Sequence, residues 1–71
     1  MSAPDQLLSA RQQLTDVGGA PPGSRWLISL PDCAALRAGL GNVSHLYGVV
    51  LEESDDPALL GRGPVLLLPG E

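Results

Sequence analysis

The sequence is poor in aromatic residues, because its 71 positions hold no phenylalanine, one tryptophan and one tyrosine. A core must therefore be built from leucine, valine and alanine, which supply most of the 44% of residues that are hydrophobic. Charged residues make up only 17%, and this balance argues against intrinsic disorder. A chain of this length forms one small domain that buries only about 60% of its unfolded surface, so a partner or an oligomer often completes the burial.

Basic residues are also scarce. The four that are present are all arginines, they are scattered along the chain, and the formal net charge is −4. No basic patch forms in the sequence, and an acidic chain repels the phosphate backbone of nucleic acids. We therefore expect no nucleic-acid partner.

Cysteines are nearly absent, and targeting segments and long apolar runs are missing. Cys33 is the single cysteine, which excludes an intramolecular disulfide and does not indicate a secreted disulfide scaffold. The first residues lack the basic-then-apolar run of a signal peptide, and no apolar run approaches the roughly 18 residues of a membrane span. We expect a protein that is not secreted and has no transmembrane segment.

The first residues predict a helix from Pro4 to about Val17. Ser2 can cap this helix, and Asp5 follows Ser2 at the spacing of a capping box. The apolar residues recur mostly three or four positions apart and form a narrow stripe, namely Leu7, Leu8, Ala10, Leu14 and Val17. The polar residues that lie largely outside this stripe are Gln6, Arg11, Gln12, Gln13 and Asp16.

Residues 18–24, GGAPPGS, form a tether in which two prolines stiffen the middle and glycines bend the ends. Two interpretations of this segment are open. In the first, residues 1–17 are a helical arm that docks on the body, residues 25–71, or on a neighbouring subunit. In the second, the tether is an ordinary connection that lets the helix pack back onto its own sheet.

The body begins with strand and helix signals. Residues 26–30 predict a strand with Trp26, Ile28 and Leu30 on one face, and Leu27 on the other face indicates a strand that is central or covered on both sides. The Ser-x-Pro-Asp signature of residues 2–5 recurs at residues 29–32 and predicts a second helix over about residues 31–38. The residues of this helix expected to face the body are Cys33, Leu36 and Leu40.

Two more strands complete the predicted fold. Residues 46–53 are apolar on both faces, and Gly48 inside this run indicates a bulge or a close backbone approach. A polar loop over residues 54–64 contains a short helical turn near residues 58–60, and residues 65–68 form the last strand. The order α-β-α-β-β predicts a small single α+β domain with a short sheet packed against one or two helices.

Few residues could carry catalysis. Cys33 lies near a predicted helix start, where the helix dipole lowers the pKa of a thiol, and His45 is the single histidine that could serve as its base. Cys33 is predicted to be buried, however, and no acid is identifiable that would orient His45. We therefore expect a core cysteine, a solvated histidine, no cofactor and no enzymatic activity.

The densest run of charge consists of Glu52, Glu53, Asp55 and Asp56. Its spacing differs from that of a calcium-binding loop, so we expect no metal ion. A solvated loop is one interpretation. The other is an acidic contact for arginines of another protein.

The strings WLISLPDCAALRAGLG, HLYGVVLEES and GPVLLLPGE resemble a segment of tailed-phage major capsid proteins. The matched positions cover about two-thirds of the chain and are Leu27, Ile28, Pro31, Ala35, Leu36, Leu46, Tyr47, Gly48, Val49 and residues 65–68. Val50 stands where that family usually has proline. The long backbone helix, extended loop and flexible arm of a shell-forming subunit are absent.

The resemblance implies a non-enzymatic phage virion structural protein, a minor capsid or head-decoration component. Its expected partners are a major capsid protein or copies of itself, and its expected location is the virion or the host cytoplasm. The candidate interface consists of Leu7, Leu14, Trp26, Tyr47, Leu59 and Leu60. The two aromatic residues are the expected anchors, although Trp26 is equally suited to the core. The alternative is a small soluble acidic protein that binds and modulates a host or phage protein through its four clustered carboxylates.

Overall fold

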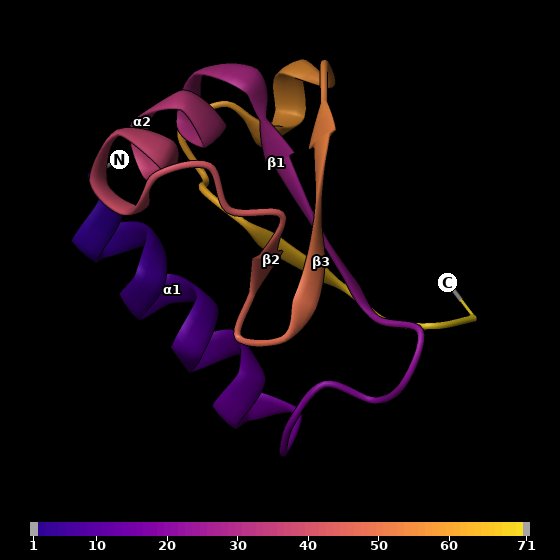
Figure 1. Cartoon of the computed structure of the whole chain (residues 1–71). Coiled ribbons are helices and arrows are strands. Elements are labelled where there is room, and N and C mark those ends of the chain that lie inside the picture. The colour runs from indigo at the N-terminus through magenta and orange to yellow at the C-terminus, as the bar shows by residue number, and fades with distance from the viewer. Residues whose placement is uncertain (1, 71) are drawn as a thin grey trace.

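The computed structural model describes residues 2–70, which place two helices on one face of a four-stranded mixed sheet (Figure 1). The helices are α1 (Ala3–Asp16) and α2 (Leu30–Leu40), and a 3-10 turn, η1, spans Pro57–Leu59. The strands are β1 (Arg25–Ser29), β2 (His45–Leu46), β3 (Val49–Ser54) and β4 (Val65–Leu67). This is the predicted small α+β domain, except that the fourth predicted element, the strand over residues 46–53, is a hairpin formed by β2 and β3. No helix of the described chain is long and apolar enough to cross a membrane.

The strands lie in the order β2-β3-β1-β4. β1 pairs in parallel with β3 and antiparallel with β4, so it is the central strand that its apolar residues on both faces predicted. The helix α2 and the short strand β2 connect the two parallel strands. Ser29 pairs with Ser54 at the end of the parallel register, so β1 and β3 end side by side.

The second predicted strand is a hairpin, which corrects the expectation of one strand over residues 46–53. The chain turns at Tyr47 and Gly48, so that Leu46 pairs with Val49. Tyr47 has φ 52° and Gly48 has φ 78°. Positive φ at both central residues is what a tight type I′ turn requires. Gly48 is therefore a turn residue and does not mark a bulge.

The first strand ends earlier than predicted, because the chain leaves the sheet at Ser29. The Ser29 side chain caps α2, and this helix begins at Leu30 and runs to Leu40. Leu30 is therefore 52% exposed instead of sharing the buried face of the strand, and Leu40 is also exposed. The prediction that Cys33 is buried is confirmed.

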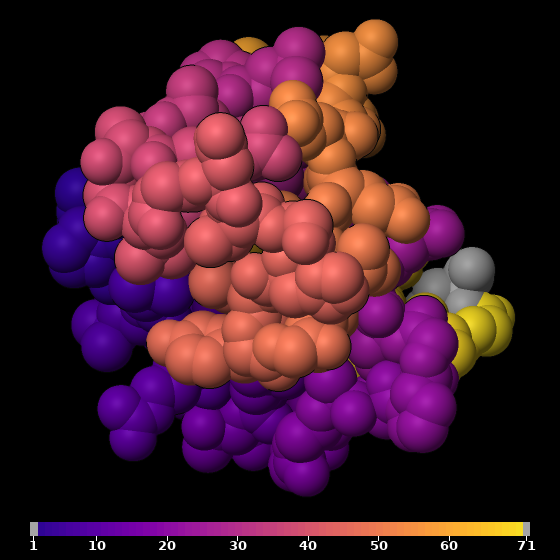
Figure 2. All heavy atoms as spheres, viewed as in Figure 1, coloured from indigo at the N-terminus to yellow at the C-terminus, as the bar shows by residue number. Residues whose placement is uncertain are grey.

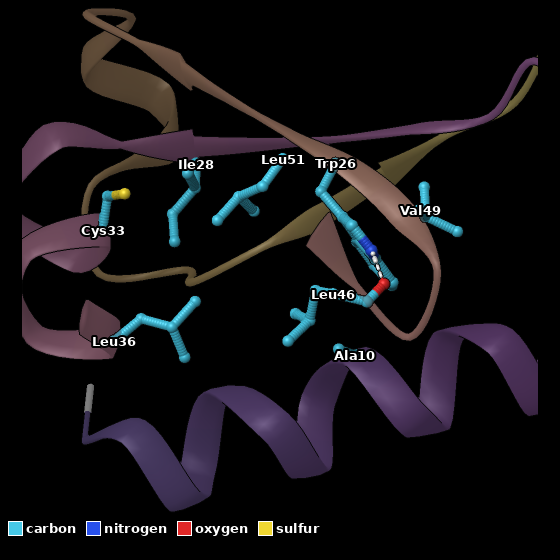
Figure 3. Packing of buried hydrophobic residues seen from close by; sticks show 8 residues of the cluster. All are labelled: Ala10, Trp26, Ile28, Cys33, Leu36, Leu46, Val49 and Leu51. Carbon is cyan, nitrogen blue, oxygen red and sulfur yellow. Dashed lines mark hydrogen bonds between the residues drawn. The ribbon is translucent and has the colours of Figure 1, made fainter. Parts of the chain in front are cut away.

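The core lies between the helices and the sheet (Figure 3). Its buried hydrophobic residues are Ala10, Trp26, Ile28, Cys33, Leu36, Leu46, Val49 and Leu51. Trp26 is fully buried at the centre, and its indole Nε1 donates a hydrogen bond of 2.9 Å to the carbonyl oxygen of Leu46. A buried indole needs such a partner, and this bond also attaches β2 to the core.

Helix α1 packs on its own chain, and two glutamines attach it. Gln6 is fully buried, and its Nε2 donates a hydrogen bond of 2.8 Å to the carbonyl oxygen of Asp32 in α2. Gln13 Nε2 donates a bond of 2.8 Å to the carbonyl oxygen of Pro64, immediately before β4. Both interpretations of the tether allow the helix to pack on its own body, and the structure shows this packing, not contact with a neighbour. The prediction that both glutamines lie outside the packed stripe is wrong, and Leu8, which was assigned to that stripe, is 68% exposed.

Candidate interaction surfaces

Cys33 and His45, the two residues that could have formed a dyad, lie on opposite faces of the sheet. Cys33 is on α2 within the core, and burial raises the pKa of its thiol. His45 is exposed, pairs with Val50 in the register, and its Nδ1 lies 3.0 Å from the Oγ of Ser44. An unreactive core thiol and a solvated imidazole on separate faces do not form a nucleophile–base pair.

The six candidate interface residues do not form one surface. Trp26 is fully buried, and Leu7 and Leu14 pack against the core. Tyr47 is 51% exposed and Leu60 is 55% exposed, but they lie at opposite ends of the sheet, because the Tyr47 turn precedes β3 and Leu60 follows η1 beyond the end of β3.

Tyr47 lies next to α1, where its hydroxyl donates a hydrogen bond of 3.3 Å to the carbonyl oxygen of Leu7. In Figure 2 the atoms of the β2–β3 turn lie directly against those of α1. The tyrosine side chain therefore joins the hairpin to the helix, and its exposed half is available for contact with a partner.

The four clustered carboxylates separate into two pairs. Glu52 lies 3.6 Å from the Nε of Arg25, and Glu53 accepts a hydrogen bond of 2.9 Å from Arg37 of α2. Within the described chain, Asp55 makes no ion pair, and Asp56 caps η1 by accepting a bond from the Ala58 amide. Of the four candidate carboxylates, Asp55 and Asp56 are therefore the two that make no ion pair within the described chain.

Asp32 occupies the amino-terminal end of α2. Its Oδ2 accepts hydrogen bonds from the Ser29 hydroxyl at 2.8 Å and from the backbone amides of Gly61 and Gly63 at 2.9 and 3.2 Å. Burial alone would raise the pKa of Asp32, but these three hydrogen bonds outweigh burial and hold the pKa below its ordinary value of 3.8. The carboxylate is therefore ionised at neutral pH, and its negative charge in the first turn of α2 offsets the partial positive charge of the helix terminus.

A groove of about 170 Å³ lies where β1 and β3 end, beside the start of α2 and η1 at the top of Figure 1. Its lining residues are Ser29, Leu30, Pro31, Ser54, Asp55, Asp56, Pro57 and Leu60. Two exposed leucines and two prolines give the groove apolar walls, and the exposed residues Asp55 and Asp56 also line it. Small-molecule sites usually occupy about 300 to 1,000 Å³. This groove is therefore the size of a single side chain and is too small for a cofactor.

The sheet face opposite the helices carries a second apolar surface, which we call the open face. Side chains alternate along each strand, so the residues of the open face are Arg25, Leu27, His45, Val50, Glu52, Val65 and Leu67. Val50 is 39% exposed, and the ion pair of Arg25 with Glu52 crosses the surface between the apolar residues. Ser54, at the end of β3, lies on this face and also lines the groove, whereas Ser29 is fully buried, so the open face meets the groove at Ser54.

No protein-family model, curated protein or solved structure matches this chain. Among residues 2–70, no group of His, Cys, Asp and Glu side chains is placed to hold a metal ion.

The sequence prediction missed the groove because it placed Leu30 in a strand. The cap at Ser29 puts Leu30 and Pro31 in the first turn of α2, so they form a wall instead of core. The signal was present in the repeated Ser-x-Pro-Asp signature, because an N-cap at Ser29 makes Leu30 the first helical residue.

Proposed function

We propose that the protein is a non-enzymatic phage virion component, a minor capsid or head-decoration protein that acts through protein–protein contacts. The observation that supports a contact role is the open face, where exposed Val50 and half-buried Leu27, Val65 and Leu67 form an apolar surface over three adjacent strands. A chain of 71 residues buries only about 60% of its unfolded surface, so an apolar sheet face is suited to contact with a partner. The assignment to a virion is supported by the resemblance to tailed-phage capsid proteins.

Contact through the sheet face is favoured over contact through the edge at β4. The Gln13 side chain occupies the outer edge of β4, where it bonds both the Pro64 carbonyl and the Leu66 amide. A partner strand cannot add there without displacing α1. Neither helix covers the open face, because both pack on the opposite face of the sheet.

Attachment to a symmetric particle suits a surface of this size. A single small apolar patch gives weak binding, but many copies displayed on a lattice reinforce one another when they also contact their neighbours. The expected partner is accordingly a major capsid protein or another copy of this chain.

A second function is favoured by Asp55 and Asp56, which make no ion pair within the described chain. A soluble acidic protein could use these carboxylates to bind and modulate a basic host or phage protein. Charge-driven binding of this kind weakens steeply between low and physiological ionic strength, whereas attachment through the open face does not.

The test is sedimentation of the tagged protein from its producing cells, followed by mass spectrometry of the proteins that sediment with it. We expect large particles rich in one abundant shell protein. Val50→Lys, which places a charge on the open face, is expected to abolish co-sedimentation, and Leu8→Lys on the exposed side of α1 is the matched control. Recovery of one soluble protein at equal stoichiometry, without particles, would contradict the virion role and support the acidic modulator.

A further inference from the structure

We infer that the groove at the end of the open face is an anchor site for a basic side chain, arginine or lysine, of the partner protein. This inference rests on the proposed contact role only in taking the occupant to belong to a protein. The aliphatic stem of the side chain would lie on Leu30, Pro31, Pro57 and Leu60, and its cationic head would lie at Asp55 and Asp56.

The shape of the groove favours one long side chain. A volume of about 170 Å³ is below the usual range of sites for whole small molecules. The groove is open to solvent along the side where Leu30 and Leu60 are 52% and 55% exposed, so a side chain can enter without a change in the backbone. Arginine and lysine both combine an apolar stem with a charged tip, which matches apolar walls next to carboxylates.

The charges around the groove favour a cation. The start of α2 contributes a partial positive charge, but Asp32 lies in the first turn of that helix and its ionised carboxylate offsets this charge. Glu52 and Glu53 are already paired with arginines, which leaves Asp55 and Asp56 as the carboxylates available for a partner. Arg62, on the neighbouring loop, is exposed and does not line the groove.

The position of the groove connects it with the proposed contact surface. Ser54, which is half-buried, lies on the open face and also lines the groove, so one partner surface can cover both. Basic side chains that insert into pockets within an apolar contact are common anchors of protein interfaces, arginine above all. The open face would then supply apolar contact area, and the groove would fix the register of the partner.

The test is an NMR titration of the ¹⁵N-labelled full chain with N-acetyl-arginine methylamide. We expect saturable shifts, with a millimolar dissociation constant, at the backbone amides of Leu30, Asp55, Asp56 and Leu60. The citrulline analogue has nearly the same shape without the charge. An exposed ion pair contributes about 0.2 to 1 kcal/mol, so we expect the analogue to bind up to about fivefold more weakly.

Substitutions test whether arginine binding depends on the groove or only on the overall charge of the protein. Asp55→Asn and Asp56→Asn are each expected to weaken arginine binding about two- to fivefold, and Asn at position 56 can still accept the bond from the Ala58 amide that caps η1. Leu60→Ala is expected to weaken it by removing one wall. Asp16→Asn, which removes the same charge at the exposed end of α1, is expected to leave binding unchanged.

Equal binding of arginine and citrulline, shifts outside the groove, or an equal loss in Asp16→Asn would each overturn the anchor site. None of these results depends on a particle, so they leave the proposed function standing. Conversely, specific arginine binding by a chain that never sediments with particles would retain the groove and contradict the virion role.

Discussion

Gln13 caps the free edge of β4 by accepting, at its Oε1, a hydrogen bond of 2.9 Å from the backbone amide of Leu66. The Nε2 of the same side chain donates a bond of 2.8 Å to the carbonyl oxygen of Pro64. One side-chain amide therefore satisfies a donor and an acceptor two residues apart on the strand, as the backbone of a further strand would. This contact both attaches α1 and protects an edge that could otherwise pair with another chain.

Gln13→Ala is expected to destabilise the fold. It leaves the Leu66 amide and the Pro64 carbonyl without their side-chain partner in a partly buried setting, and the expected loss is about 1–3 kcal/mol in the free energy of unfolding. Urea denaturation measures this loss, and size-exclusion chromatography detects association through the uncovered edge. Gln12→Ala is the control, because Gln12 is exposed and bonds only Asp16. Equal losses in the two variants would contradict the capping role of Gln13.

Asp32→Asn is expected to lower the free energy of unfolding at neutral pH. It is also expected to make that free energy fall less steeply as the pH decreases. The pKa of Asp32 is lowered in the folded state, so the unfolded chain takes up the proton first as the pH falls below 3.8. The stabilisation from this carboxylate is complete above that pH and is lost as the pH falls through the folded-state pKa. Urea denaturation at several pH values should therefore show a steeper acid decline in the parent than in Asp32→Asn, which should lose about 1–3 kcal/mol at pH 7.

Asp5→Asn provides the matched control for Asp32→Asn. Asp5 occupies the same place in the first Ser-x-Pro-Asp signature, and its amide bonds the Ser2 hydroxyl as that of Asp32 bonds Ser29. Asp5 is exposed, however, and does not bind the amides of the 61–63 loop. A loss of stability in Asp5→Asn as large as that in Asp32→Asn would show that the local cap, and not the bond to the loop, provides the stabilisation.

Gly39→Ala tests the close approach of the two helices. Alanine normally favours a helix over glycine by about 0.8–1 kcal/mol. A Cβ at position 39 would lie 2.5 Å from the Cβ of Ala3, so the helices must move apart. We expect the cost of this clash to exceed the gain in helix propensity, so that the free energy of unfolding of the variant falls by about 1–3 kcal/mol. Ala3→Gly in the same chain should restore most of that loss, and failure of the double variant to recover would contradict the contact.

The features predicted correctly from the sequence are local ones. Ser2 and Ser29 cap their helices because the signal for a cap lies within four consecutive residues. The burial of Cys33 and the central position of β1 were also predicted correctly, from the spacing of apolar residues within one helix and one strand. The fold class required only the order of these elements.

The features that were missed depend on partners far along the chain. Gln6 and Gln13 look like residues of a polar helix face, and only their partners at Asp32, Pro64 and Leu66 make them part of the interior. The hairpin turn was missed because tyrosine is an unusual residue at positive φ, so the segment had no Asn-Gly or Asp-Gly signal. The local Ser-x-Pro-Asp signature encodes the cap that exposes Leu30, but the groove also requires η1 to lie beside the start of α2, and no local pattern encodes that contact.

Alkylation of Cys33 tests the alternative of a thiol enzyme. Burial is the main cause that raises the pKa of this thiol, the Glu53 charge adds to it, and the Arg37 charge opposes it. We therefore expect negligible reaction with iodoacetamide at neutral pH in the folded protein and rapid reaction in urea. Mass spectrometry measures the extent directly, because the chain has one cysteine. Fast stoichiometric alkylation without denaturant would contradict the role of Cys33 as a core residue.

Tyr47→Asn tests whether Tyr47 contributes to the stability of the fold or to the binding of a partner. Asparagine suits a turn position with φ 52° better than tyrosine does, and the hydroxyl bond that is lost, to the Leu7 carbonyl, is exposed and 3.3 Å long. We expect unfolding in urea to show unchanged or slightly higher stability, while co-sedimentation with particles decreases because an exposed aromatic residue is removed. Tyr47→Phe, which retains the ring and loses the hydroxyl, is expected to bind as the parent does. If Tyr47→Asn instead unfolds more easily and binds normally when folded, the tyrosine serves to hold the hairpin against α1.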